Sequence, residues 1–408
     1  MGDDKQHFDG TPEAKLPWHD WILLPMLGLL TICLIAVAVE LIATRMYPSQ
    51  ALTQEVGSNG CVILNDTLTG ARGFPNTACK EKIGEGELTE YVFNRCGDRA
   101  GEECGPKPEG TYRIVMIGSS FTFGYRVPME KSFAALLPAK LSRRTGLKID
   151  LYNKGMEWET PRVAELRMNS VIAMKPDMIF WVVSPWDIQY ATLLLPDQVP
   201  AANARSFASK VKYRIEQGLA KPIPDAFNHI SQNVLRWFRS THSAILLLHV
   251  LYSSRVWYVR SYLTGGEDTE YLRSNSSAQW QNSLKEFDGY ATQIVGQAKA
   301  AKVPVVVTLV PFRPQAAMLS MGKWPVGYDP YKLDDDLRAM FTNQGETYID
   351  ILPGFRDIPD SERGFLIVDG HPNAYGNAIF SELMAKGLAN GAVSALSDNR
   401  QASFVQGK

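Results

Sequence analysis

The serine best placed for chemistry is Ser120, which follows an apolar run and lies between two glycines, Gly118 and Gly124. A strand that ends in such a turn exposes the hydroxyl at the carboxyl end of a sheet, where open α/β folds bind ligands. The glycines let a substrate approach the backbone and leave amide N–H groups for an oxyanion. Turns of this kind are common between strands and helices, so Ser120 needs a base before it indicates catalysis.

His371 is the histidine that could serve as this base. The chain has six histidines, and the other five lie near the N-terminus or in a long interruption of the fold pattern. Asp369 precedes His371 by two positions, which puts both side chains on one side of an extended backbone. Asp369 can then hold Nδ1–H while Nε2 accepts the serine proton. The run also suits a turn and an N-cap for the last helix, and both roles can hold together.

The elements that must position these residues alternate along the chain. Short β-branched runs predict five strands buried on both faces, at Tyr112–Ile117, Lys148–Tyr152, Met178–Val183, Val303–Val310 and Thr347–Ile351. Helical patterns lie between and after them, at Ser132–Arg144, Pro161–Met174, Leu284–Ala301 and Ala374–Leu388. Strands separated by helices predict a parallel sheet in a three-layer α/β domain, over residues 109–395, followed by a tail, 396–408.

Residues 189–283 interrupt this alternation and contain one apolar helix of their own, Ala244–Val259. We expect an inserted helical subdomain that packs on the core and does not span a membrane. A lid over the site, or a face that lies on a membrane, remains open because the segment carries Trp257, Arg255 and Arg260.

Residues 21–44 are apolar over the roughly 20 positions that a membrane-spanning helix needs. A buried core helix and a cleaved signal peptide are the alternatives; the apolar run continues through Glu40 to Arg45 without a small-residue cleavage site, which favours an uncleaved anchor. Residues 1–20 are expected to be a cytoplasmic leader. Positive charges on either side of the span decide its orientation only weakly.

Four of the five cysteines lie in residues 45–108, which we expect to form an irregular, Cys-rich collar. An even number in a compact stretch predicts two disulfides and an oxidising compartment, hence a periplasmic or other extracytoplasmic domain on the inner membrane. Proximity favours Cys61–Cys79 and Cys96–Cys104, although three connectivities are possible. A zinc site is the competing interpretation, but no Cys-x-x-Cys pair and no nearby histidine supports it.

Composition narrows the function classes. The formal net charge is -1, so no surplus of basic residues is available to neutralise nucleic-acid phosphates. No pattern implies a metal or a cofactor.

Over roughly residues 90–392 the chain resembles the SGNH (GDSL-type) hydrolase superfamily, and is similar to its membrane-anchored, alginate O-acetyltransferase-type members. Four motifs carry the resemblance, in order: Gly118-Ser-Ser120 after an Asn94-Arg-Cys-Gly-Asp-Arg99 entry, Asn153-Lys-Gly155, Ser184-Pro-Trp186-Asp187 and Asp369-Gly-His371-Pro-Asn. The resemblance implies a flavodoxin-like five-stranded sheet, a Ser120–His371–Asp369 triad, and an oxyanion hole made by the N–H groups of Ser120 and Gly155. Trp186 and Asp187 would line the pocket.

The chain departs from the family pattern in three ways. Ser119 stands where the first block has aspartate, and the Asp-to-His spacing is one residue shorter than usual. Trp186 occupies the third-block asparagine position, so one side-chain donor to the oxyanion is replaced by an indole. Losing one such donor costs about 10²–10³ in rate in a well-studied protease.

Two functions follow. The first is a membrane-anchored esterase or O-acyltransferase that acts on acyl esters of a cell-envelope glycan or lipid. The second is a catalytically idle domain that serves as a structural or binding subunit of a membrane complex, because fold resemblance alone does not establish activity.

Overall fold

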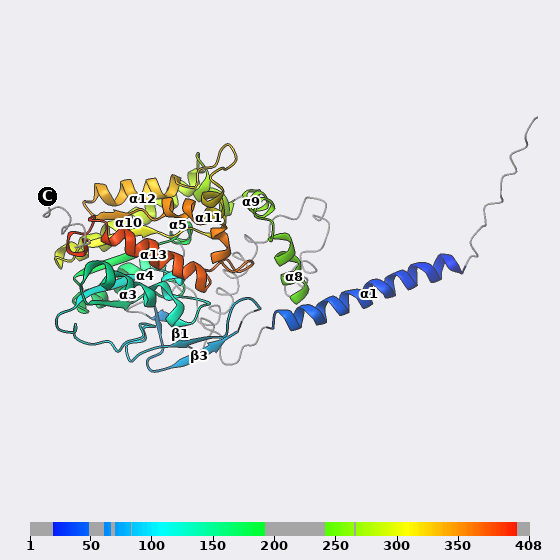
Figure 1. Ribbon diagram of the computed structural model, residues 1–408, viewed down its shortest axis with the longest axis horizontal. Coiled ribbons are helices and arrows are strands. Elements are labelled where there is room, and N and C mark those ends of the chain that lie inside the picture. Colours follow the sequence, from blue (N-terminus) through cyan, green and yellow to red (C-terminus); the bar gives the residue numbers. More distant parts are fainter. Residues whose placement is uncertain are drawn as a thin grey trace, which may run out of the picture.

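The computed structural model describes residues 19–48, 61–66, 70–82, 84–191, 241–264 and 267–397. It shows an α/β domain from which one long helix projects (Figure 1). The expected leader, most of the expected tail and the part of the insertion between residues 192 and 240 lie outside the described residues.

The core of the domain is a parallel sheet with strand order β6-β5-β7-β8-β9. In chain order this is 2-1-3-4-5, the flavodoxin-like arrangement. The fold class predicted from the sequence is therefore confirmed. The strands are β5 (Tyr112–Ile117), β6 (Ile149–Asn153), β7 (Met178–Val183), β8 (Val305–Leu309) and β9 (Thr347–Ile349).

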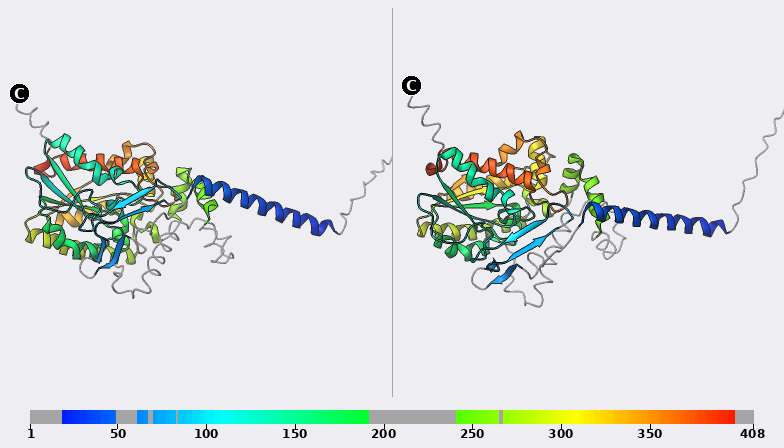
Figure 2. Two further views of the ribbon diagram at one scale, coloured as in Figure 1. Left: turned by 90° about the horizontal axis from the view of Figure 1, so that it is seen from below. Right: turned by 60° about the horizontal axis from the view of Figure 1, so that its bottom comes forward.

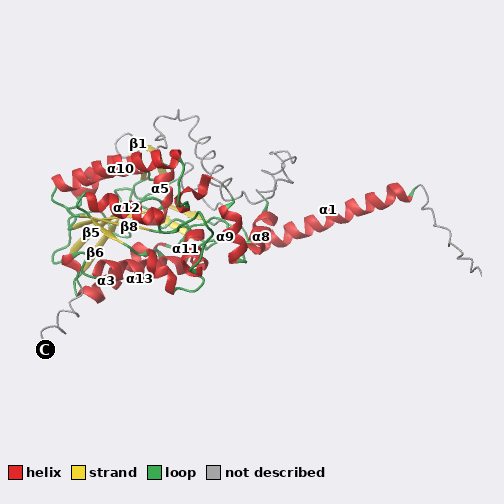
Figure 3. Cartoon of the chain, turned by 90° about the horizontal axis from the view of Figure 1, so that it is seen from above, coloured by secondary structure: helices red, strands yellow, loops and turns green. Residues whose placement is uncertain are grey.

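Helices cover both faces of this sheet, which explains why β7 and β8 are buried along their whole length. Figure 3 shows α3 and α13 on one side of the strands and α5, α10 and α12 on the other. The helices are α3 (Phe133–Thr145), α4 (Pro161–Ala173), α5 (Pro185–Gln189), α10 (Ala278–Ala300), α11 (Arg313–Met321), α12 (Lys332–Asn343) and α13 (Ala374–Ala389). The 3₁₀ turns are η1 (Met129–Lys131), η4 (Glu267–Leu272), η5 (Leu352–Asp357), η6 (Ser361–Gly364) and η7 (Ser394–Leu396).

The Cys-rich segment is more regular than the sequence predicts. It forms two antiparallel hairpins, β1 (Val62–Asp66) with β2 (Gly70–Gly73) and β3 (Ala78–Glu81) with β4 (Thr89–Val92), drawn in blue in Figure 2. The alternating burial of β4, inward at Thr89 and Tyr91, is the period of two that defines a half-buried strand. Disulfides join Cys61 to Cys79 and Cys96 to Cys104, each with Cα atoms 6.2 Å apart, so the pairing favoured by proximity is confirmed.

The expected single helix of the insertion is two helices, α8 (His242–Leu251) and α9 (Arg255–Leu263). The break lies at Ser253 and Ser254, and the Ser254 hydroxyl accepts a hydrogen bond from Trp257 N–H as the N-cap of α9. Serine competes with helical backbone bonding, which explains why the apolar run does not continue as one helix.

The projecting helix is α1 (Asp20–Met46). Among the described residues it is the one helix long and apolar enough, over Trp21–Met46, to cross a membrane. Its large apolar side chains are exposed, whereas Ala43 near its end is fully buried. Figure 1 shows α8 beside this end of α1.

Candidate active site

Ser120 lies directly beyond β5 as the first residue of the short helix α2 (Ser120–Phe123). The turn depends on Gly118, whose φ of 147° is strained for any other residue. A Cβ atom there would lie 2.4 Å from the carbonyl oxygen of Val182, so only glycine lets the turn pass the neighbouring strand. Since Ser120 opens α2, its N–H belongs to the first turn, which a helix cannot satisfy internally.

Ser120, His371 and Asp369 meet in the geometry of a catalytic triad. His371 Nε2 lies 2.8 Å from Ser120 Oγ, and Nδ1 lies 2.6 Å from Asp369 Oδ1. The carboxylate thus fixes the tautomer that carries a proton on Nδ1, which leaves Nε2 free to accept the serine proton. The side chains of His371 and Asp369 are about a fifth exposed. Phe121 and Tyr125 pack against the imidazole, with ring centroids 5.3 and 5.0 Å away.

The second oxygen of Asp369 faces Arg126. Arg126 Nε lies 3.5 Å from Asp369 Oδ2, and its Nη1 lies 2.8 Å from Glu81 Oε1 of β3. Burial alone would raise the pKa of Asp369, but His371 and Arg126 hold it well below its usual range. The carboxylate therefore stays ionised, as an acid that orients an imidazole must.

Glu85 of the Cys-rich segment holds the loop that carries the histidine and the aspartate. Its buried carboxylate accepts hydrogen bonds from the N–H groups of Val368, at 2.9 Å, and Asp369, at 2.8 Å. On its other side, Glu85 Oε1 lies 2.7 Å from His249 Nε2 of α8. Glu85 and Arg126 were not recognised in the sequence, because both act through residues more than two hundred positions away.

The same segment also braces the nucleophile turn through Arg99. Its guanidinium is buried and donates hydrogen bonds to the carbonyl oxygens of Phe123 (3.0 Å), Gly124 (2.6 Å) and Val127 (2.9 Å). Burial lowers the pKa of Arg99 to about 10, so it remains charged at neutral pH. Arg99 closes the entry motif of the family resemblance, and its contacts give that motif a physical role.

The expected role of Gly155 in the oxyanion hole is not supported by its contacts. Gly155 N–H donates a hydrogen bond to Asn153 Oδ1 at 2.9 Å and is therefore occupied. Glycine is needed here for packing, since a Cβ atom would lie 2.7 Å from the backbone nitrogen of Phe123. Asn153 also donates to the carbonyl oxygen of Thr122 at 2.8 Å, so this motif supports α2 from below. Of the two expected donors, only the N–H of Ser120 remains.

Trp186 stands at the start of α5, where β7 ends, and is half-buried. Its ring lies edge-on to Trp158, with centroids 6.3 Å apart, and near Tyr190, at 5.2 Å. Trp158 has a left-handed backbone, with φ of 64°, which is uncommon for so large a residue. Its pairing with Trp186 was not anticipated from the sequence.

Asp187 lies beneath the nucleophile turn and not in an open pocket. It is buried and accepts hydrogen bonds from Ser184 N–H and Oγ, both at 2.7 Å, and from Ser119 Oγ at 3.3 Å. Burial raises the pKa of Asp187 to about 6, although these hydrogen bonds oppose the shift. Ser119, at the position of the first-block aspartate, thus ties the turn to the end of β7.

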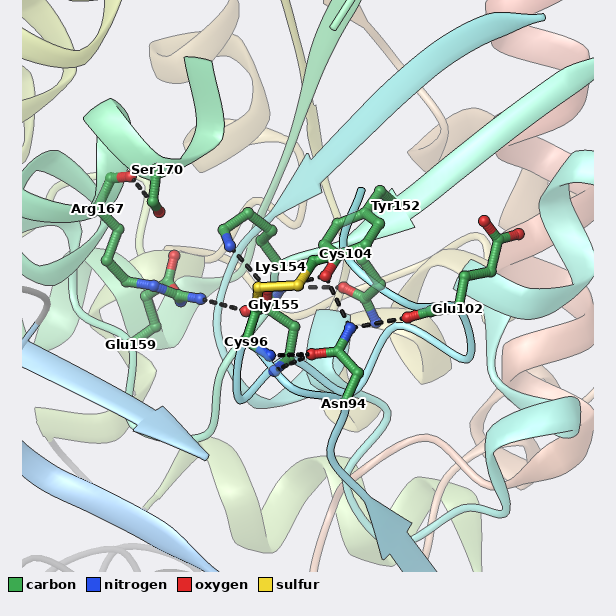
Figure 4. Close-up of polar contacts among 12 residues, drawn as sticks. Asn94, Cys96, Glu102, Cys104, Tyr152, Lys154, Gly155, Glu159, Arg167 and Ser170 are labelled. Carbon is green, nitrogen blue, oxygen red and sulfur yellow. Dashed lines mark hydrogen bonds and ion pairs between the residues drawn. A yellow bond between two sulfur atoms is a disulfide. The ribbon is translucent and has the colours of Figure 1, made fainter. Parts of the chain in front are cut away.

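A second set of charged side chains is more deeply buried and includes Lys154, Glu159 and Arg167 (Figure 4), with Asp98 as a shared partner of Lys154 and Arg167. Asp98 accepts from Lys154 Nζ at 2.8 Å and Tyr152 Oη at 3.0 Å, and pairs with Arg167 at 3.4 Å. Arg167 also pairs with Glu159, whose pKa burial raises to about 7. None of these side chains contacts the triad. In the part of the chain that the structure describes, no cluster of three or more histidine, cysteine or acidic residues could hold a metal ion.

Comparison with protein-family models and with curated proteins gives no match. Solved structures do match. An α/β hydrolase from the metagenome of Lake Arreo, Spain, matches with 13% identity and a TM-score of 0.37, over 70% of this chain and 96% of that chain. The esterase EstA from Pseudoalteromonas sp. matches with 11% identity and a TM-score of 0.35, over 68% of this chain and 96% of that chain. The lipase/acylhydrolase from Enterococcus faecalis matches with 13% identity and a TM-score of 0.33, over 68% of this chain and 95% of that chain. The three are described as an α/β hydrolase, an esterase and a lipase/acylhydrolase. At such low TM-scores, what this chain does is argued from its own topology and contacts.

Proposed function

We propose that the protein is a serine esterase or O-acyltransferase with a Ser120–His371–Asp369 triad. The observation that supports this most is the unbroken chain of contacts from Asp369 Oδ1 through both imidazole nitrogens to Ser120 Oγ, at 2.6 and 2.8 Å. Nucleophilic catalysis requires this arrangement of a serine in a tight turn, an imidazole of fixed tautomer and an ionised carboxylate, whereas a binding or structural domain does not.

In the proposed reaction, Ser120 Oγ attacks the carbonyl carbon of an acyl ester while His371 Nε2 takes its proton. The bond to the alcohol then breaks, and His371 returns the proton to the leaving oxygen. Water or an acceptor hydroxyl resolves the acyl-enzyme by the same steps in reverse. We expect the N–H of Ser120 to stabilise the oxyanion. With Gly155 N–H occupied, we expect a modest rate.

The substrate class we favour is an acyl ester of a cell-envelope glycan or lipid. Two features support an extracytoplasmic site next to a membrane. The first is α1, which is long and apolar enough to span a bilayer. The second is the pair of disulfides, which form in oxidising compartments. Anchoring on the inner membrane with a periplasmic domain accommodates both.

The proposal is tested by turnover of 4-nitrophenyl esters of increasing chain length in detergent. We expect Ser120→Ala to abolish hydrolysis and Ser119→Ala, its neighbour in the same turn, to keep most of it. Equal activity of the wild type and Ser120→Ala would overturn the proposal. Adding an acetylatable oligosaccharide and measuring its acylation by mass spectrometry then separates transfer from hydrolysis.

A further inference from the structure

The depth of α8 relative to a membrane follows from α1. From Trp21 to Glu40, α1 covers about 29 Å at 1.5 Å per residue. This equals the roughly 30 Å of hydrocarbon in a bilayer. If the hydrocarbon begins at Trp21, it ends near Glu40, and the last residues of α1, up to Met46, extend about 9 Å beyond it.

α8 is fixed to α1 at this level. The Glu40 carboxylate accepts hydrogen bonds from the N–H groups of His242, at 3.0 Å, and Ser243, at 2.8 Å, the first residues of α8. Further along, the rings of Tyr47 and His249 lie 4.6 Å apart. If Glu40 lies at the hydrocarbon boundary, the first turn of α8 lies at the level of the lipid headgroups, and His249, beside Tyr47, lies about 10 Å further from the hydrocarbon.

Four apolar side chains of α8 and α9 are exposed, and we call them the α8–α9 surface: Leu247, Val250, Val256 and Trp257, with exposed fractions of 45, 63, 67 and 37%. The helices behind them are firmly held. Arg255 pairs with Glu362 at 2.9 Å, and Arg313 donates to the carbonyl oxygen of Tyr252 at 3.2 Å. The exposed side chains are therefore a fixed surface and not a frayed segment.

We propose that the α8–α9 surface lies in the interfacial layer of the bilayer and forms a second membrane contact beside α1. A lipid surface is the occupant because α8 begins beside the end of the span, where the lipid headgroups would lie. Amphipathic aromatic and aliphatic side chains, such as Trp257 with its neighbours, favour this layer. The inference rests on the proposed anchoring of α1 in a membrane.

A short chain of contacts links α8 to the triad. His249 of α8 contacts Glu85, and Glu85 holds the N–H groups of Val368 and Asp369 on the catalytic loop. One side chain thus separates the membrane-facing helix from the loop that carries the general base. The substrate class that fits is an acyl group presented at the bilayer surface, carried by a lipid or by a lipid-linked glycan.

The full chain in phosphatidylcholine vesicles allows a direct test with a fluorophore on a single cysteine. Cys33, exposed on α1, is the native free cysteine and reports anchoring. In a Cys33→Ala background, Val250→Cys reports the α8–α9 surface. Val326→Cys, at a fully exposed residue before α12, is the matched control. Quenching is measured with lipids that carry nitroxides at the headgroup or deep in the acyl chain.

We expect at least fivefold stronger quenching at position 250 than at position 326 by headgroup nitroxides, and deep quenching at Cys33. If the label at Cys33 is quenched but the labels at positions 250 and 326 are quenched equally, the proposed lipid contact of the α8–α9 surface is wrong, although α1 is still anchored in the membrane. Absence of quenching at all three positions would overturn both. If Val250→Cys molecules cross-link to one another and their labels are not quenched by lipid, the α8–α9 surface contacts a second copy of the chain, and the proposed lipid contact is wrong.

A functional readout separates this inference from the proposed chemistry. Val250→Asp should hydrolyse a water-soluble acetyl ester at the wild-type rate, because residue 250 lies outside the triad. On an acyl ester embedded in vesicles we expect its rate to fall several-fold. If Val250→Asp and the wild type hydrolyse the vesicle substrate at equal rates, the inference is wrong. If the wild type hydrolyses neither substrate, the proposed enzymatic function is wrong.

Discussion

The Cys-rich segment contributes to two charged networks that look alike but contact different parts of the molecule. In the Arg126 network, Glu81 pairs with Arg126, Arg126 pairs with Asp369, and Glu85 accepts hydrogen bonds from the N–H groups of Val368 and Asp369. In the Asp98 network, Asp98 holds Lys154 and Arg167 beneath the nucleophile turn, and their side chains are 3 to 7% exposed. If the proposed function holds, the first network orients a reacting group, while the second places compensated charge in the interior.

The contrast separates effects on rate from effects on stability. Breaking a buried ion pair leaves an uncompensated charge and destabilises the fold. A substitution that lets the general base move out of its productive orientation leaves the protein folded but raises the activation barrier of the chemical step. Variants in the Arg126 network should therefore lower kcat, and variants in the Asp98 network should lower the free energy of unfolding.

The largest effect is expected for Asp369→Asn. An amide at this position favours the wrong imidazole tautomer, and we expect kcat for an acetyl ester to fall by about 10³–10⁴-fold. Because the ionised carboxylate also pairs with Arg126, thermal unfolding should occur at a lower temperature, so kcat is measured where the variant is still folded. Asp335→Asn removes a carboxylate of α12 that is 61% exposed and is the control. A variant that keeps more than a tenth of the wild-type kcat would mean that Asp369 does not orient the base.

Next in size is the effect of Asp98→Ala on stability. Lys154 and Arg167 lose a shared partner in a buried site, and we expect the free energy of unfolding to fall by about 3–5 kcal/mol. Urea titration in detergent measures it. Glu90→Ala, which breaks the half-exposed Lys80–Glu90 pair, should cost less than about 1 kcal/mol. A stable Asp98→Ala protein with a greatly reduced kcat would break the distinction between the two networks.

A smaller, pH-dependent effect is expected at Asp187, which belongs to neither network. Its pKa is raised from 3.8 to about 6 in the folded protein. Between these values the folded state retains a proton that the unfolded state has released, so stability falls as pH rises through this window. Asp187→Asn does not titrate, so its stability relative to the wild type should rise between pH 4 and 7, by at most about 3 kcal/mol. A difference that is constant over this range would contradict the shift.

The smallest effect is expected for Glu85→Gln. A neutral amide can accept the hydrogen bonds from the catalytic loop but without their charge-assisted strength, and we expect kcat to fall by about tenfold with KM unchanged. Glu87→Gln, two positions along and half exposed, is the matched control. A rise in KM at constant kcat would place Glu85 in substrate binding and not in positioning.

The sequence predicted the features that local chemistry decides. The β-branched runs became the five strands, and β5 and β7 begin and end where expected. The short helices α2 and α5 and the longer helices α11 and α12 were not predicted. In α11 nearly every side chain is buried, so no polar face alternates with an apolar one and the helical period is hidden.

Contacts between distant segments account for the rest. Ser120, His371 and Asp369 could be named from motifs, because each motif carries its own residue types. The occupation of Gly155 N–H by Asn153 depends on a side-chain rotamer, which sequence does not specify. Glu85 and Arg126 have no motif of their own, and their importance comes from folding the Cys-rich segment against the catalytic loop.

The central claim is that Ser120 is an activated nucleophile, and covalent labelling by a fluorophosphonate tests it most directly. The intact protein in its membrane is incubated with the probe, and the modified peptide is located by mass spectrometry. We expect one adduct on Ser120, retained in Ser119→Ala, absent in Ser120→Ala and formed much more slowly in His371→Ala. A wild-type protein that stays unlabelled, or one labelled equally well without His371, would contradict the claim.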